Sequence, residues 1–391
     1  MSLINEAKGL IKQNIREYGM YIALIIIMVT FSAATGGQFM SSRNISNLIN
    51  QTGYIAVLAV GMTLVMVIKH IDLSVGFLAG FLGAIAAILM MRFNVSVPVT
   101  ILLVLVFGTI TGTFTGFLVA KMGIPAFVAS LAAMLVFRGA LLMVTEGTGT
   151  IVISNKAFNA IGNGFIPDFV NMGNLHVLTL IIGIVGIAAY VWSEIKTRND
   201  KIKYNFEVIS STMFTVKLVA ISAVIGYVTW ILAGYNGLSW TVVITIIVVL
   251  IYHFITTKTI IGRHVYAVGG NAEAAKLSGI NVERITMIVF ASMGMLSALS
   301  GILYTSRLQS ATTTAGTLFE LDAIAAAYVG GVSANGGVGK VTGSIIGAFV
   351  MASLTNGMNL VGVGISYQYI IRGIILAVAV IFDVKTRNRS K

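Results

Sequence analysis

The sequence predicts an all-α fold, a polytopic transmembrane helical bundle, from its composition and from the length of its apolar runs. Of its 391 residues, 57% are hydrophobic and only 10% are charged. Soluble globular chains are about 45–50% apolar and about 25% charged, so this chain has too little charge to cover itself in water. Its apolar residues also fall in runs close to the roughly 20 residues that a helix needs to cross the hydrocarbon core. Most soluble fold classes are thereby excluded.

We expect about 10–12 membrane segments, the number of apolar runs long enough to cross or enter a bilayer. In chain order the runs lie at 20–36, 53–68, 74–91, 97–118, 125–145, 175–192, 214–233, 238–256, 285–304, 320–331, 341–359 and 367–382. As a helix, the segment 320–331 reaches only about 18 Å, too short to face lipid across a bilayer. We therefore expect a half-helix there, enclosed by protein.

Charge placement orients the chain. The net charge is +12, and most of the 25 Lys and Arg residues lie in segments that face the cytoplasm if the N-terminus does. On the other side there are only four, namely Arg43, Arg92, Lys156 and Arg307. This is the positive-inside pattern, which predicts cytoplasmic termini. The positive charge therefore indicates topology and not nucleic-acid binding.

Residues 1–19 predict an N-terminal helix on the inner membrane surface, because apolar and basic residues fall on separate parts of its helical wheel. A solvated lead-in is the alternative. No small-residue cleavage site follows the first apolar run, so we expect no removable signal peptide. Because the chain has no cysteine, disulfides, thiolate metal sites and cysteine nucleophiles are excluded.

Spaced glycines indicate two related groups of four helices, 53–145 and 285–382. Glycines recur every four residues in the third helix of each group, at Gly108, Gly112 and Gly116 and at Gly343 and Gly347. Such spacing lets helices approach closely in lipid. The groups would run in opposite directions across the membrane, so the pattern predicts the inverted repeat common among transporters. Glycine-mediated packing alone would explain much of the same pattern.

No catalytic or metal-binding arrangement is visible. The string ANGGVGKV at 334–341 lacks the first glycine and the magnesium-binding hydroxyl of a phosphate-binding loop. The four histidines lack metal-ligand spacing. A few charges lie within spans or at helix starts, where we favour structural and capping roles over proton coupling. These are Asp72, Arg138, Glu320, Asp322 and Arg372.

The segment 257–284 contains a predicted short helix. Asn271 suits its N-cap, Glu273 its first turn, and Gly279 its C-terminal end. Such a helix could be a handle for a partner protein or a simple connecting loop, and composition leaves both open.

Six motifs follow one another along the chain: IDLSVG (71–76), GIPAFVASLAAMLVFRG (123–139), GGNAEAAKLSGINV (269–282), FELDAIAAAYVGG (319–331), GGVGKVTGSIIGA (336–348) and NGMNLVGV (356–363). In this order they resemble the motifs of the ribose- and xylose-type permeases of bacterial ABC importers. The additional hydrophobic segments and basic loop at 175–256 make the chain similar to the D-xylose and multiple-monosaccharide permeases.

The resemblance implies a single transmembrane permease domain over 1–391, in the bacterial cytoplasmic membrane. A homodimer would form the path for a monosaccharide, xylose or a related pentose or hexose. Two cytosolic ATP-binding subunits would hydrolyse ATP, and an external sugar-binding protein would contact the loops 37–52, 146–174 and 305–318. The permease itself would be no enzyme and would need no cofactor. The resemblance places ATPase coupling in the cytoplasmic region 257–284, at Asn271, Ala272, Glu273, Ala274, Ala275, Lys276, Leu277, Ser278 and Gly279.

A neutral sugar requires hydroxyl and amide partners, which suggests Gln309, Tyr328, Asn356 and Asn359 as path-lining residues. Each could instead hydrogen bond between helices. Two other functions stay open, a nucleoside or autoinducer importer on the same scaffold and a secondary sugar carrier that works alone. A polytopic membrane enzyme is disfavoured because no acid, base or metal cluster is present.

Overall fold

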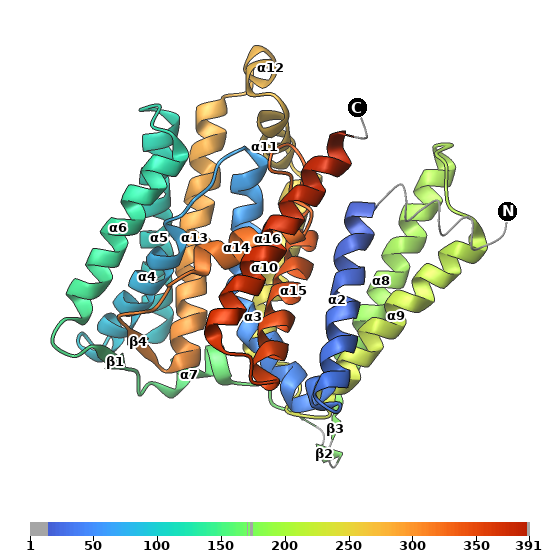
Figure 1. Cartoon of the computed structure of the whole chain (residues 1–391), viewed down its shortest axis with the longest axis horizontal. Coiled ribbons are helices and arrows are strands. Elements are labelled where there is room, and N and C mark those ends of the chain that lie inside the picture. Colours follow the sequence, from blue (N-terminus) through green and yellow to red (C-terminus); the bar gives the residue numbers. More distant parts are fainter. Residues whose placement is uncertain (1–14, 170, 173–174, 389–391) are drawn as a thin grey trace.

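Every predicted membrane segment is helical in the computed structural model, which describes residues 15–169, 171–172 and 175–388 (Figure 1). Eight helices within these residues are long and apolar enough to cross a membrane. They are α3 (Ser42–Val67), α5 (Val97–Ala120), α6 (Ala126–Thr145), α8 (Val177–Lys203), α9 (Ser211–Ala233), α10 (Trp240–Lys258), α13 (Val282–Leu308) and α15 (Val341–Leu360). The all-α bundle is therefore confirmed.

Four further helices complete the predicted set. They are α2 (Ile15–Ala34), α4 (Val75–Met91), α14 (Phe319–Val329) and α16 (Ile365–Asn388). The segment predicted as a half-helix is α14, which has 11 residues and is buried along most of its length. Most of the expected surface helix over 1–19 lies outside the described residues, and its last residues begin α2.

Short elements connect these helices. The helical ones are η1 (Gln38–Met40), α7 (Lys156–Asn163), α11 (Ile260–Gly270) and α12 (Ala272–Leu277). Strand β1 (Thr150–Val152) pairs antiparallel with β4 (Ser310–Thr312), with Ile151 opposite Ala311. Strand β2 (Asn171–Met172) pairs with β3 (Leu175–His176).

The prediction of an external loop over 37–52 is wrong, because α3 already begins at Ser42. The first turns of α3 are polar in sequence, which hid them from a reading based on apolar runs. Their polar groups are satisfied within the fold: the Thr52 hydroxyl donates to the Leu48 carbonyl, and the Ser239 hydroxyl donates to the Asn50 amide oxygen. Polar residues can therefore extend a buried helix beyond its apolar run.

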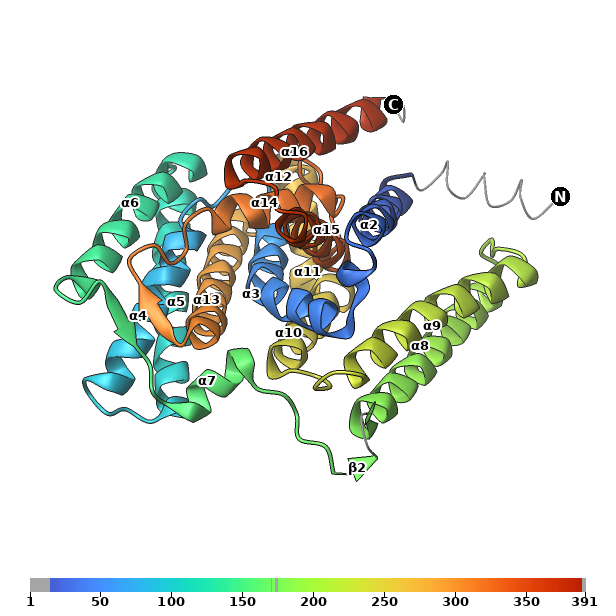
Figure 2. The ribbon, with the colours of Figure 1, turned by 60° about the horizontal axis from the view of Figure 1, so that its bottom comes forward.

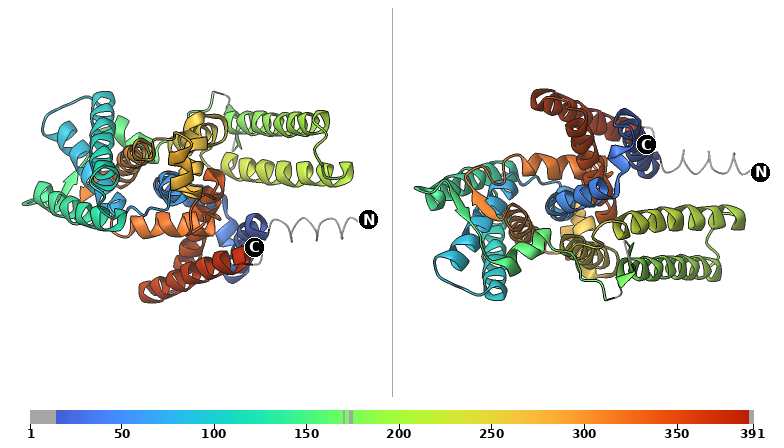
Figure 3. Two further views of the ribbon diagram at one scale, coloured as in Figure 1. Left: turned by 90° about the horizontal axis from the view of Figure 1, so that it is seen from above. Right: turned by 90° about the horizontal axis from the view of Figure 1, so that it is seen from below.

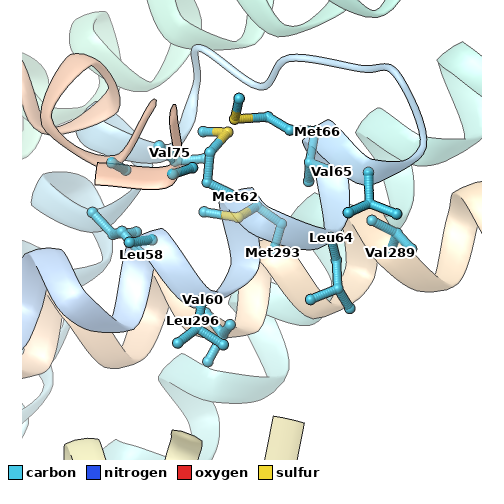
Figure 4. Packing of buried hydrophobic residues seen from close by; sticks show 14 of the residues in the cluster. Leu58, Val60, Met62, Leu64, Val65, Met66, Val75, Val289, Met293 and Leu296 are labelled. Carbon is cyan, nitrogen blue, oxygen red and sulfur yellow. The ribbon is translucent and has the colours of Figure 1, made fainter. Parts of the chain in front are cut away.

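Helix α13 lies at the centre of the core, packed against α3, α4 and α5. Met62 of α3 lies beside Met293 of α13 in the largest apolar cluster (Figure 4). Glycines bring α5 and α13 together, because a Cβ added at Gly294 would lie 2.8 Å from both the Cα and the N of Gly112. The prediction that the spaced glycines form close helix contacts is confirmed here.

The first helix of each four-helix group packs against helices of the other group. Helix α3 packs on α14 and α15, whereas α13 packs on α4 and α5. Contacts also link α4 with α6 and α14 with α16. An inverted repeat predicts this reciprocal pattern, and we retain the repeat as a proposal.

Helix α12 marks one side of the bundle. Helix α2 begins and α16 ends on that side, whereas β1, β3 and α7 lie on the opposite side (Figure 1). The hairpin formed by α8 and α9 leans away from the other helices (Figures 2 and 3). Its neighbour in the bundle is α3, which contacts α9.

Candidate functional site

Helix α12 has the ends that its sequence predicts. The Asn271 side chain is the N-cap and accepts a hydrogen bond from the Ala274 amide at 3.0 Å. At the other end Gly279 has φ +83°, and the Ile280 amide donates to the Ala275 carbonyl at 3.0 Å. This is a Schellman motif, in which a left-handed glycine closes the helix. The local sequence thus defines both ends.

One face of α12 is exposed. Leu277 is 91% exposed, Glu273, Ala274 and Lys276 are also exposed, and Ala275 is buried. Leu277, Glu273 and Lys276 lie on a helix that protrudes from the fold (Figure 1), so their side chains are accessible to a partner protein.

The α11–α12 segment is bonded to the end of α3. The Lys69 ammonium, just after α3, donates to the carbonyl of Gly270 at 3.2 Å. The Gly337 amide, in the loop before α15, donates to the carbonyl of Val67 at 2.8 Å. Three segments far apart in sequence therefore meet beneath α12.

Two further contacts join this region to its neighbours. The Tyr266 hydroxyl of α11 donates to the Gly339 carbonyl at 2.5 Å, and burial raises the pKa of Tyr266, which keeps the donor protonated. Lys121, at the end of α5, pairs with Glu283 in the first turn of α13 at 2.7 Å. A displacement of α11–α12 would consequently reach α3 and the loop that leads into α15.

A small polar cleft of about 80 Å³ lies between α3, α14, α15 and α16. Arg372 of α16 forms an ion pair with Asp322 of α14 at its wall. The ring of Tyr54 also lines the cleft, 5.1 Å from the ring of Tyr304 and 4.9 Å from that of Phe319. The other polar lining residues are Gln51, Thr52 and Thr355. Aromatic, amide, hydroxyl and ionic groups are thus concentrated in one place.

Two of the predicted path residues form interhelical hydrogen bonds. Asn356 of α15 and Asn44 of α3 exchange amide hydrogen bonds of 2.9 and 3.1 Å. The Asn359 side-chain oxygen accepts from the Gln368 amide of α16 at 2.8 Å. These bonds match the alternative that the sequence left open, and the path role stays a prediction.

The other two predicted path residues lie apart from each other. Gln309 is exposed at the C-cap of α13, in the left-handed region at φ 54°. Tyr328 is half-buried near the end of α14 that leads to the loop before α15. The structure therefore does not bring the four residues into one cluster. It gathers Gln51, Tyr54, Asp322 and Arg372 instead, of which only the two charged residues stood out in the sequence.

Of the three remaining charged residues, Asp72 and Arg138 have capping or packing partners, whereas the buried Oε2 atom of Glu320 has no hydrogen-bond partner in the part of the chain that the structure describes. Asp72 accepts from the amide and the hydroxyl of Ser74 at 2.9 and 2.6 Å, in the turn that starts α4. The Arg138 guanidinium lies 5.5 Å from the centre of the Phe77 ring. Glu320 is buried in the first turn of α14. Within the described residues, no group of three His, Asp or Glu residues could hold a metal ion.

A family model described as "Branched-chain amino acid transport system / permease component" matches residues 44–380. The chain belongs to this family. It is 40% identical over 382 residues to the xylose transport system permease protein XylH of Escherichia coli strain K12, covering 98% of this chain and 95% of the relative. The ribose import permease protein RbsC of Haemophilus influenzae is 36% identical over 370 residues, covering 94% and 93%. No solved structure matches the chain.

These comparisons confirm the resemblance to xylose- and ribose-type permeases. The relatives are named as transport permeases and not as enzymes. Together with the apolar helices, they make this chain a multi-pass membrane permease.

Proposed function

We propose that this chain is the membrane subunit of an ATP-driven importer that carries a monosaccharide, xylose or a related pentose or hexose, into the bacterial cytoplasm. The similarity to a xylose transport permease along nearly the whole of both chains supports this most strongly. The importer would contain two copies of this chain, two cytosolic ATP-binding subunits and an external sugar-binding protein.

In this proposal α12 contacts the ATP-binding subunit. Its exposed Leu277 offers an apolar anchor, and Glu273 and Lys276 offer charged partners around it. The side of the bundle that carries α12 also holds most basic loop residues, so the positive-inside rule makes it cytoplasmic. Both termini then lie in the cytoplasm as well.

ATP-driven movement would enter the membrane through the bonds beneath α12. A push on α11–α12 would act on the end of α3 through Lys69, and on the loop before α15 through the bond from Tyr266 to Gly339. We propose alternating access, in which closure of the ATP-binding subunits rocks the two copies of this chain about small-residue helix contacts such as Gly112 against Gly294. The β1–β4 side would then face the binding protein.

The polar cleft between α3 and α16 is our candidate for a station on the sugar path. A monosaccharide has apolar C–H faces and many hydroxyls, which suit the Tyr54 ring and the amide of Gln51. The cleft is smaller than a ligand pocket of roughly 300 Å³ or more, so the station would open during the transport cycle. Gln309, Tyr328, Asn356 and Asn359 stay proposed further along the path.

Reconstitution in liposomes tests the proposal. The chain with its ATP-binding subunit and binding protein should take up xylose with ATP, and the Ala274→Asp variant should lose that uptake. Asn199→Asp is the control, since it adds the same charge at an exposed position of α8. Uptake by the chain alone would instead show a secondary carrier. ATP-dependent uptake of a nucleoside or an autoinducer, but of no sugar, would reassign the substrate.

A further inference from the structure

An apolar cavity of about 500 Å³ separates the α8–α9 hairpin from the rest of the bundle. Five helices line it, namely α3, α8, α9, α10 and α15. Representative lining residues are Ala56, Ile182, Val224, Val249 and Phe349. No role in transport described above uses this cavity.

The cavity offers few hydrogen-bonding groups to a polar ligand. Its threonine hydroxyls already have partners: those of Thr229 and Thr245 each donate to a backbone carbonyl one turn earlier, at 2.8 Å. The Thr179 hydroxyl accepts from the Leu238 amide at 3.0 Å. Water therefore has few hydrogen-bond partners there, and a water needs two to four.

The position of the cavity restricts its occupant to molecules of the bilayer. All five lining helices are candidate membrane spans, and the lining residues come from their central turns as well as from their ends. A soluble protein cannot reach that depth. A single hydrocarbon chain of a lipid is thin and apolar, and it is the bilayer component whose shape suits such a cavity.

We propose that one acyl chain of a bilayer phospholipid occupies this cavity as a bound component of the protein. The hairpin has few other attachments: α9 contacts α3 and β3, whereas the main contacts of α8 are with α9. Figures 2 and 3 show both helices leaning away from the bundle. The lipid chain supplies apolar packing between the hairpin and the bundle where protein side chains do not.

Gly186 provides a way to fill the cavity. It lines the cavity, and a Cβ added there would meet no atom within 4 Å. A larger side chain at this position would therefore occupy part of the cavity proposed for the acyl chain. Gly139 is the matched control, because it is also helical and also has nothing within 4 Å, but it lies on the exposed surface of α6.

The test is the amount of phospholipid retained by the full chain after extensive washing in detergent, measured by native mass spectrometry. Wild-type protein and Gly139→Phe should retain a phospholipid. Gly186→Phe should lower its occupancy about tenfold, as expected if about two buried methylene groups are displaced. If Gly186→Phe does not fold, Gly186→Leu is measured instead.

Equal phospholipid retention by the Gly186 variant and wild type would overturn the proposal. Retention of detergent alone by the wild type would overturn it as well. The measurement does not depend on the transported substrate, so it stands or falls separately from the importer function.

Discussion

Removing the N-cap of α12 should loosen this helix alone. Asn271→Ala deletes the acceptor of the Ala274 amide, and loss of an Asn cap costs about 1 kcal/mol. Helix α12 has six residues, far fewer than the roughly 12–15 that an isolated helix needs. A cost of about 1 kcal/mol should therefore raise its open population about fivefold.

Hydrogen–deuterium exchange can measure this local opening. Amides of 274–280 should exchange about fivefold faster in Asn271→Ala, in line with a cost of about 1 kcal/mol, while the temperature of global unfolding stays unchanged. In the reconstituted importer, ATP-driven uptake should fall along with the folded population of α12.

Asn281→Ala is the matched control. Asn281 caps α13 in the same way and accepts from the Arg284 amide at 2.9 Å. Because α13 has 27 residues and is held by the core, its loss of a cap should leave uptake and the exchange of α12 unchanged. Identical exchange of α12 in Asn271→Ala and wild type would refute the reasoning that its caps hold it folded.

Three further variants test the packing and the charges. Gly294→Ala should lower the free energy of unfolding by about 1–3 kcal/mol through overpacking at the α5–α13 contact, whereas Gly139→Ala should not, and equal thermal stability of the two would contradict the close contact. Burial raises the pKa of Asp72, although the hydrogen bonds from Ser74 lower it. The folded state therefore loses stability as the pH rises above the ordinary Asp pKa of about 3.9. Asp72→Asn should consequently stabilise the protein at pH 7 and not at pH 4. Arg372→Ala should cost about 2 kcal/mol by leaving Asp322 unpaired, and adding Asp322→Asn should recover part of this in thermal unfolding; no recovery would mean that the ion pair is unimportant.

Local features were predictable because local physics decides them. The apolar runs located the membrane helices, and the caps Asn271 and Gly279 fixed the ends of α12. The start of α3 was not predictable, because its polar residues are satisfied by partners such as Ser239, far along the chain. Hydropathy cannot register a partner that only the fold supplies.

The polar cleft shows the same limit for the site. Arg372 and Asp322 were conspicuous as charges in or next to spans, but their pairing depends on how α14 and α16 pack. Gln51 and Tyr54 carry no such signal, since a glutamine and a tyrosine in a helix are ordinary. Asn356 and Asn359 have the right chemistry for a sugar, and their amides bond to neighbouring helices.

The short β1–β4 ribbon joins two distant parts of the chain on the side opposite α12. It fastens the chain leaving α6, in the first helix group, to the chain leaving α13, in the second. The two helix groups therefore cannot separate there without breaking strand pairs. Because the chain has no cysteine, thiols introduced at the facing positions Ile151 and Ala311 would stand alone in the protein. A disulfide formed and reduced between these two thiols would lock and release the two helix groups.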